Sequence, residues 1–376
     1  MKFSISRSVL FKALSHVQSV VERRNSPAIL ANVKIEALSD AEGEFISLTT
    51  TNTDMEMTEK VKASVDTAGI VTVSAQKLYE IVRKLPDGAD VSFATGKSKN
   101  QISVTAGKVK FQLATLPAED FYQLPQENMT VSFVMAASDL ALLISKTQFA
   151  IALEETRHYL NGIYMHELSK GGSSVMRVAA TDGHRLACIE MPLPKGAEGM
   201  PGIIIPRKTI AEVLKLLEEQ SDAMVDISLS PAMICFKVGS VILTSKLIDG
   251  TYPDYERVIP EGNEKVMEMN AKVLMDAVDR VSVIAEKTRA VKLSMQKNKL
   301  MVSASNADEG SAEEELDAVY KEDLLEIGFN YRYLLDILGQ IRSGKVKFTF
   351  SDAMSPTVVH EAEHTGSVYV LMPMRI

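Results

Sequence analysis

The stretch Val178-Ala-Ala-Thr-Asp-Gly-His-Arg-Leu-Ala187 places a carboxylate, an imidazole and a guanidinium around one glycine. Loops often carry function, and Asp182 with His184 has the residue types of a general acid and base. Asp-Gly between two apolar runs is also typical of a turn between strands, which requires no chemistry. Alternation along a strand turns Asp182 and His184 to one side, without a nucleophile nearby in the sequence. A hydrolase is therefore the less favoured interpretation.

A second motif, His360-Glu-Ala-Glu-His364, matches H-E-x-x-H, in which a helix brings two histidines to one zinc ion. The flanking Val and Tyr residues are typical of strands, where positions four apart lie about 13 Å from each other. No Asp, Glu or His follows His364 as a third ligand. A zinc metalloenzyme using His360, Glu361 and His364 is therefore kept only as the alternative function. We expect no metal site, no cofactor and no catalytic residue.

The composition is that of an ordinary globular protein. The chain has 376 residues, 46% of them hydrophobic and 24% charged, and a net charge of −8. This length predicts two or three domains. No apolar run reaches the roughly 18 residues that a membrane span requires. The first residues begin a strand-like alternation, so we expect no signal peptide, and we expect Cys188 and Cys235 to be reduced core residues of a cytoplasmic protein.

An internal repeat organises the chain and positions these motifs. Each of three copies, about 120 residues long, shows a short strand, an amphipathic helix, several strands, a second helix and further strands. So many short strands must form sheets, and both helices must cover the apolar face of those sheets. We therefore expect an α+β fold with mostly antiparallel sheets. Short polar linkers at 126–130 and 261–265 place the domains at 1–128, 129–261 and 262–376.

Basic residues concentrate in the predicted helices. The windows 7–24, 74–85, 138–157, 206–219, 271–289 and 330–345 hold 19 Lys and Arg against 12 Asp and Glu, whereas the remainder of the chain has a net charge of −15. Exposed helix faces favour Lys and Arg in any protein, which is one explanation. The other is that the six helices share a surface facing a polyanion. Because the helices show neither a dense Arg and Asn recognition face nor a run of aromatics, backbone contact without base reading is favoured.

Several motifs together resemble one family. They are the triple repeat, Thr181-Asp-Gly-His-Arg-Leu186, Pro206-Arg-Lys208, Thr244-Ser-Lys-Leu-Ile-Asp-Gly250, Tyr252-Pro-Asp-Tyr255 and Met372-Pro-Met-Arg-Ile376. They resemble the bacterial DNA sliding clamps, the beta processivity subunits of the replicative DNA polymerase, along the whole chain. The resemblance implies three clamp domains per chain and a head-to-tail homodimer that forms a six-domain ring. It also implies a non-enzymatic role, in which the ring encircles duplex DNA, is opened by a clamp loader and tethers polymerase and other replication and repair proteins.

The resemblance also implies three sets of site residues. In the DNA-contacting set, the resemblance supplies Arg24, Arg157, Tyr159, Arg207 and Arg257, whereas Lys12, Lys77 and Arg83 come from the faces of the predicted helices opposite their apolar stripes. The dimer-interface set pairs Lys108, Lys110 and Phe111 with Val283, Ile284, Glu313, Glu314 and Glu315 of the other protomer. The third set forms a pocket for partner peptides that resemble Gln-x-x-Leu-Phe, and its residues are Leu160, Thr181, Gly183, His184, Arg185, Leu186, Pro253, Val258, Val370, Met372, Pro373, Met374 and Arg375. In that pocket His184 supplies shape and hydrogen bonds, with no proton transfer.

Overall fold

The computed structural model describes residues 1–22, 27–41, 43–96, 100–125, 127–362 and 364–375. These residues contain six α-helices, two in each repeat, as the sequence predicts: α1 Arg7–Val17, α2 Ala75–Lys84, α3 Ala137–Ser145, α4 Arg207–Glu219, α5 Ala271–Ser282 and α6 Tyr331–Leu338. Four of them end well before their sequence windows do: α1 at Val17, α3 at Ser145, α5 at Ser282 and α6 at Leu338. None of the helices in this part of the chain is long and apolar enough to cross a membrane.

The order of elements repeats three times. A strand leads directly into the first helix of each copy (β1–α1, β10–α3, β18–α5), and another strand leads into the second (β6–α2, β14–α4, β23–α6). Polar residues at these junctions accept hydrogen bonds from free backbone N–H groups of the first helical turn. Ser74 caps α2, Asn270 caps α5 and Asn330 caps α6. The starts of these three helices are therefore encoded locally, at the end of the strand before each.

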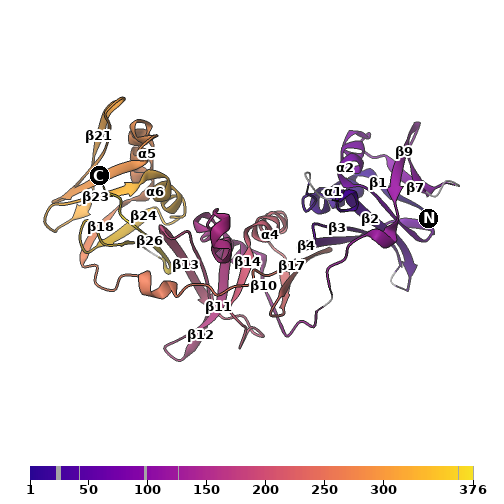
Figure 1. Ribbon diagram of the computed structural model, residues 1–376, viewed down its shortest axis with the longest axis horizontal. Helices are drawn as coiled ribbons and strands as arrows, with labels where there is room; N and C mark the ends of the chain where they lie inside the picture. The colour runs from indigo at the N-terminus through magenta and orange to yellow at the C-terminus, as the bar shows by residue number, and fades with distance from the viewer. Residues whose placement is uncertain (23–26, 42, 97–99, 126, 363, 376) are drawn as a thin grey trace. The chain divides into compact units, whose positions relative to one another are not determined.

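One compact unit contains residues 1–140, 195–197 and 211–247. Its strands form a 13-stranded antiparallel sheet in the order β10-β15-β16-β17-β4-β3-β2-β6-β9-β8-β7-β1-β5. Figure 1 shows α1 and α2 side by side against this sheet. The strands are β1 Lys2–Ser6, β2 Asn32–Asp40, β3 Gly43–Thr51, β4 Met55–Lys62, β5 Ser64–Thr67, β6 Gly69–Ser74, β7 Asp90–Thr95, β8 Gln101–Ala106, β9 Val109–Leu116, β10 Val131–Ala136, β15 Met224–Leu229, β16 Met233–Val238 and β17 Val241–Lys246.

The other compact unit contains residues 141–194, 198–210 and 248–376. It has a nine-stranded sheet, β14-β11-β12-β13-β26-β25-β24-β18-β22, and a four-stranded sheet, β21-β20-β19-β23. The helices α5 and α6 pack against each other in this unit (Figure 1). The strands are β11 Gly162–Lys170, β12 Ser173–Thr181, β13 Arg185–Pro192, β14 Ile203–Pro206, β18 Lys265–Asn270, β19 Ala290–Gln296, β20 Lys299–Asn306, β21 Gly310–Asp317, β22 Val319–Tyr320, β23 Leu325–Asn330, β24 Lys345–Phe350, β25 Thr357–Glu361 and β26 His364–Leu371.

The compact units divide the middle repeat. Its strands β15–β17 join the first repeat through the pairing of β17 with β4, and its strands β11–β14 join the last repeat through the pairing of β13 with β26. Long antiparallel ladders therefore run from one repeat into the next. Short 3-10 helices complete the connections: η1 Ala28–Ala31, η2 Ala118–Asp120, η3 Gln148–Ala150, η4 Glu155–Leu160, η5 Tyr255–Val258 and η6 Val283–Ala285.

The interior of each unit is apolar, built from the alternate residues of the strands and one face of each helix. Cys188 is buried in β13, where burial raises the pKa of its thiol to about 12, and Cys235 is half-buried in β16. Both cysteines are free thiols. A thiol held protonated in this way is a packing residue, which agrees with the expectation from sequence.

Candidate functional site

The stretch with which the sequence analysis began is a tight turn between β12 and β13. The Thr181 hydroxyl donates to the Arg185 carbonyl at 2.7 Å and accepts from the Gly183 N–H at 3.1 Å. The Asp182 carboxylate accepts from the backbone N–H groups of His184 and Arg185, at 2.9 and 3.1 Å. Gly183 has φ of +87°, a backbone conformation that side chains disfavour. Every polar residue of this turn except His184 is thus used to fix its shape.

The first repeat contains the same turn. Thr51 donates to the Met55 carbonyl, and the Asn52 side chain accepts from the N–H groups of Asp54 and Met55. Thr53, at the position of the glycine, has φ of +78°. The turn is therefore a structural element of the repeat, and its hydrogen bonds need no catalytic explanation.

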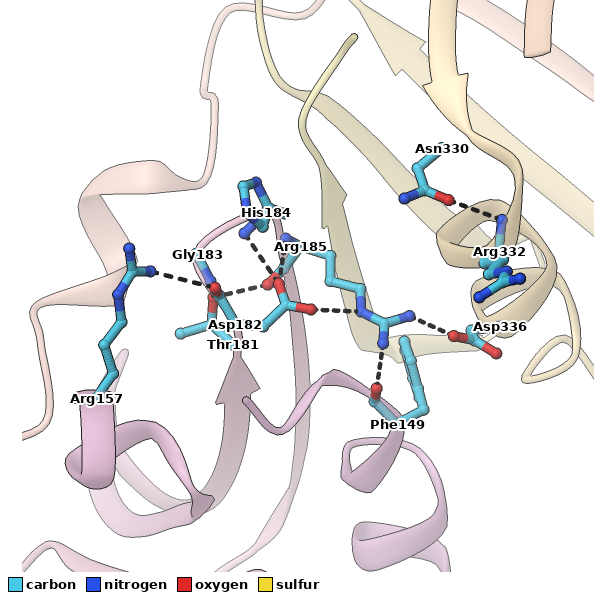
Figure 2. A network of polar contacts seen from close by, with 10 residues as sticks. All are labelled: Phe149, Arg157, Thr181, Asp182, Gly183, His184, Arg185, Asn330, Arg332 and Asp336. Atoms are coloured by element: carbon cyan, nitrogen blue, oxygen red, sulfur yellow. Dashed lines mark hydrogen bonds and ion pairs between the residues drawn. The ribbon is translucent and has the colours of Figure 1, made fainter. Parts of the chain in front are cut away.

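Arg185 connects this turn to distant parts of the same unit (Figure 2). Its guanidinium donates to Asp182 at 3.1 Å, to Asp336 on α6 at 2.5 Å and to the Phe149 carbonyl at 2.5 Å. It also lies over the ring of Tyr333, 4.3 Å from the ring centroid. Only 9% of the side chain is exposed. Charge-assisted hydrogen bonds of this kind, combined with a cation–π contact, hold the turn rigidly in place.

An acid–base pair is not formed here. The Asp182 carboxylate faces the backbone and Arg185, whereas the His184 ring stacks on Tyr333 with a centroid separation of 6.2 Å. The two side chains that could have done chemistry therefore point to different partners. The turn interpretation of this stretch is confirmed, and His184 remains free to present its ring to a ligand.

Beside the turn lies a cavity of about 350 Å³, which we call the β13 pocket. The C-terminal strand closes one side, because the Met372 N–H donates to the His184 carbonyl at 3.0 Å. Its lining is mostly apolar, and behind it lies a buried cluster that includes Cys188 and Tyr252. The lining residues are Arg157, Tyr159, Leu160, Thr181, Gly183, His184, Arg185, Leu186, Pro253, Asp254, Tyr255, Val258, Val370 and Met372. Exposed apolar side chains at its edge include Val258 and Met372.

The predicted pocket residues lie together in this cavity, with three exceptions at the end of the chain. Pro373 does not line the β13 pocket, and Met374 and Arg375 line a different hollow against β19–β21. The Met374 N–H donates to the Gly328 carbonyl on β23, which directs the chain end away from the pocket. Asp254 and Tyr255 line the pocket but were missed from sequence. Their place in the Tyr-Pro-Asp-Tyr motif was the available signal.

The predicted DNA-contacting residues fall into two groups. Lys12 on α1, Lys77 and Arg83 on α2, and Arg207 at the start of α4 are exposed on helices. Arg157 and Tyr159 on η4 line the β13 pocket, and Arg257 on η5 is exposed and paired with Asp254. Arg24 lies outside the described residues. The structure therefore places part of this set beside the pocket, away from the long helices.

Among the described residues, the first part of the predicted interface set lies at or next to an open edge of β9. Along β9, pairing with β8 is complete, but pairing with β6 reaches only Thr115 and Leu116, so the stretch with Lys110 and Phe111 has a free edge. Lys108 precedes this stretch in an exposed turn. An apolar hollow of about 460 Å³ lies against it, between α2 and β9, and is lined in part by Ile81, Leu85, Val109 and Phe111. We call it the α2–β9 hollow.

The second part of the predicted interface set, which would meet β9 of the other protomer, lies in the last repeat. Within the part of the chain that the structure describes, the edge strand β21 pairs with β20 alone, and it carries Glu313, Glu314 and Glu315. Glu314 forms an ion pair with Arg280 at 2.6 Å, and Glu315 one with Lys299 at 2.5 Å. In η6, Val283 is 65% exposed and Ile284 is half-buried.

The H-E-x-x-H stretch lies on a hairpin and not on a helix. Strand β25 ends at Glu361 and β26 begins at His364, with these two residues opposite each other. The strand context predicted from sequence is confirmed, although the histidines occupy two strands and not one. The Glu361 carboxylate is buried and bonded to Lys146 at 3.0 Å and to the Arg342 N–H at 2.7 Å. It is therefore a structural anion. No group of three potential metal ligands occurs among the described residues.

Comparison with known proteins gives consistent matches along the whole chain. The family model for the DNA polymerase III beta subunit, N-terminal domain, matches residues 1–125, the central-domain model matches 135–254 and the C-terminal-domain model matches 256–375. A beta sliding clamp of Caulobacter vibrioides is 46% identical over 377 residues, with 100% of both chains covered.

Solved structures are also similar. A sliding clamp (DNA polymerase III subunit beta) of Bartonella birtlesii, bound to griselimycin, has a TM-score of 0.96 and 46% identity, and all of both chains is covered. A sliding clamp of Pseudomonas aeruginosa has a TM-score of 0.92 and 38% identity with the same full coverage. The similarity therefore extends over all three repeats.

Proposed function

The chain belongs to the family of DNA polymerase III beta subunits, the bacterial beta sliding clamps, and on that premise we propose how it works. It is a processivity factor of DNA replication without catalytic activity of its own. In the proposed mechanism the protein encircles duplex DNA as a ring and tethers the replicative polymerase and other replication and repair proteins. A tethered polymerase stays at high effective concentration near the primer end.

The ring is a head-to-tail homodimer of two three-domain chains, with domains at 1–128, 129–261 and 262–376. Two unlike strand edges support this arrangement, since an open edge is a template for pairing with another chain. In the dimer, β9 of one protomer pairs with β21 of its partner. The exposed Val283 and the half-buried Ile284 enter the α2–β9 hollow, and the basic residues around Lys108 and Lys110 meet the acidic residues of β21. A heterologous contact that closes in this way gives a ring.

The DNA is held loosely by exposed basic side chains. Lys12, Lys77, Arg83 and Arg207 project from helices as flexible cations, and Arg24 belongs to the same set by position in the sequence. Such cations contact phosphates without reading sequence, so the ring slides. Retention on DNA comes from topology, and a clamp loader must open the ring. We place the protein in the cytoplasm, with the DNA.

Partner proteins bind the β13 pocket through peptides that resemble Gln-x-x-Leu-Phe. The observation that carries this proposal is the pocket itself: an apolar cavity of about 350 Å³ whose wall is a rigid turn held by Arg185. Apolar cavities with a few fixed polar groups are typical ligand sites. The flexible Met372 at the edge suits a surface that accepts several related peptides.

Two measurements test the ring. The mass in solution should be that of a dimer, and protein loaded on nicked circular DNA should remain there until the circle is cut. Replacing Arg24, Lys77 and Arg83 by Ala should reduce loading. The same number of charges removed from sheet and loop positions, at Lys237, Lys297 and Lys321, should not. A monomer that leaves intact circles would refute the ring.

A third measurement tests the pocket. The variant Met372→Ala, and deletion of residues 372–376, should weaken binding of a Gln-x-x-Leu-Phe peptide while the dimer remains. Met224→Ala is the matched control, because Met224 is also exposed but lies on β15 in the other compact unit. Unchanged peptide affinity after the deletion would show that the peptide binds elsewhere.

A further inference from the structure

The η5 wall of the β13 pocket rests on a row of polar side chains that the sequence analysis did not single out. His166 on β11 lies directly opposite Arg177 on β12, and Arg177 lies directly opposite Glu190 on β13. Directly paired residues share one face of a sheet. His166, Arg177 and Glu190 therefore form one row across three neighbouring strands, with η5 packed over them.

Two contacts attach η5 to this row. The Tyr255 hydroxyl lies 2.7 Å from Nε2 of His166, and the Glu256 carboxylate is paired with the Arg177 guanidinium. Arg177 also donates to Glu190 at 2.9 Å, which fixes its own position. Since Tyr255 and the neighbouring Pro253 line the pocket, these contacts determine the position of the η5 wall.

The hydrogen bonds define the state of His166. Its Nδ1 lies 3.0 Å from the Glu167 carbonyl, which only accepts, so Nδ1 carries the proton. In a neutral ring Nε2 is then an acceptor, and the Tyr255 hydroxyl donates to it. Tyr255 is 5% exposed and its ring contacts Tyr164, Tyr252 and His166 edge-on. The hydroxyl is thus directed by His166 inside an aromatic cluster.

We propose that His166 is a positioning residue of the partner-peptide pocket, which acts by accepting the Tyr255 hydroxyl proton and so fixing the η5 wall. This inference rests on the proposed function of the β13 pocket. Protonation of Nε2 reverses this bond: the imidazolium donates to the hydroxyl oxygen, which already receives a hydrogen bond from Arg177, and the buried hydroxyl proton loses its acceptor. It also adds a second positive charge beside Arg177. Peptide affinity then falls in acid, although His166 itself does not touch the peptide.

The groups around His166 place its protonation below neutral pH. His166 faces Arg177 from β12, Tyr255 and Glu256 from η5, and Tyr164 on its own strand. Burial lowers the pKa of His166 from its ordinary value of 6.5, and the charge of Arg177 lowers it further. Together they outweigh the hydrogen bond to the Glu167 carbonyl and the charge of Glu256, which both raise it. The imidazole is therefore neutral at pH 7.5, and the loss of affinity belongs to the range below about pH 6.5.

The test uses the full chain and a Gln-x-x-Leu-Phe peptide that contains no Asp, Glu or His. At pH 7.5, His166→Leu and Tyr255→Phe should each weaken binding about fivefold, the effect of losing one neutral hydrogen bond, and the double variant should be no weaker than either. His166→Gln keeps an acceptor at the position of Nε2 and cannot titrate, so it should bind like the wild type.

The pH profile separates positioning from simple packing. Between pH 7.5 and 5.0 the wild type should lose affinity about threefold more than His166→Gln. His184 is present in both proteins, so its contribution cancels in this comparison. Equal pH profiles, or wild-type affinity in His166→Leu, would overturn the positioning role. Absence of peptide binding to the wild type at pH 7.5 would instead overturn the proposed function of the pocket.

Discussion

The ion pair between Lys146 and Glu361 gives the sharpest prediction about stability. Lys146 follows α3, Glu361 ends β25, and both side chains are less than 5% exposed. The ammonium group lies 3.0 Å from the carboxylate and also contacts the Gln340 carbonyl. Burial alone would raise the pKa of Glu361, but Lys146 and two backbone N–H groups outweigh it and hold the pKa below its ordinary 4.5. The carboxylate is therefore charged at neutral pH.

We expect Lys146→Met to cost about 3–5 kcal/mol, because it fills the same space and leaves a buried charge without its counter-ion. For a compact unit of this size, each kcal/mol lowers the melting temperature by about 2–4 °C. The transition of the unit that contains β25 should therefore fall by roughly 6–20 °C at pH 7.5. Most of that cost is the uncompensated carboxylate, which is the reason for choosing this variant.

Scanning calorimetry at pH 7.5 measures the transition, with hydrogen exchange to assign it to β24–β26. Lys272→Met is the matched control. Lys272 forms an exposed ion pair with Asp276 at i and i+4, so its loss should cost less than about 1 kcal/mol. Equal and small losses in the two variants would refute the argument that burial makes the Lys146 pair important.

Two further predictions follow from single positions. Gly183→Ala places a side chain at φ of +87°, which should lower the free energy of unfolding by about 1–2 kcal/mol and weaken peptide binding. Gly171→Ala is the control, because it lies at φ of +58° in the β11–β12 hairpin. It should cost similar stability and leave peptide binding unchanged. Equal peptide affinity in the two variants would contradict this. Burial would lower the pKa of His16, but the hydrogen bonds that its ring donates to the Glu59 and Glu219 carboxylates outweigh burial and raise the pKa above 6.5. The stabilisation from protonated His16 is complete below about pH 6.5 and is lost as pH rises through the raised pKa. In urea unfolding, the wild type should therefore lose stability relative to His16→Gln between pH 6 and pH 9. Parallel stability profiles of the two proteins would argue against this.

Much of the architecture follows from the sequence because it is encoded locally. The strand–helix junctions at Ser74, Asn270 and Asn330 depend on neighbouring residues, and the helix and strand periods repeat in each copy. The turn at Thr181–Arg185 is also local: its hydrogen bonds run between residues two to four apart and recur at Thr51–Met55. Such elements form wherever the same short pattern appears, so a sequence with three copies predicts them three times.

Tertiary structure decided which residues the site uses. The H-E-x-x-H pattern suggested chemistry for Glu361, but a lysine more than 200 positions earlier neutralises it. Asp336 and Phe149 hold Arg185, and His166 holds Tyr255, at separations for which no local pattern exists. The contact with Asp336 also depends on how β13 of the middle repeat pairs with β26 of the last repeat. A repeat fixes what each copy can form by itself, whereas the pocket exists only where two copies meet, and its shape depends on side chains from both.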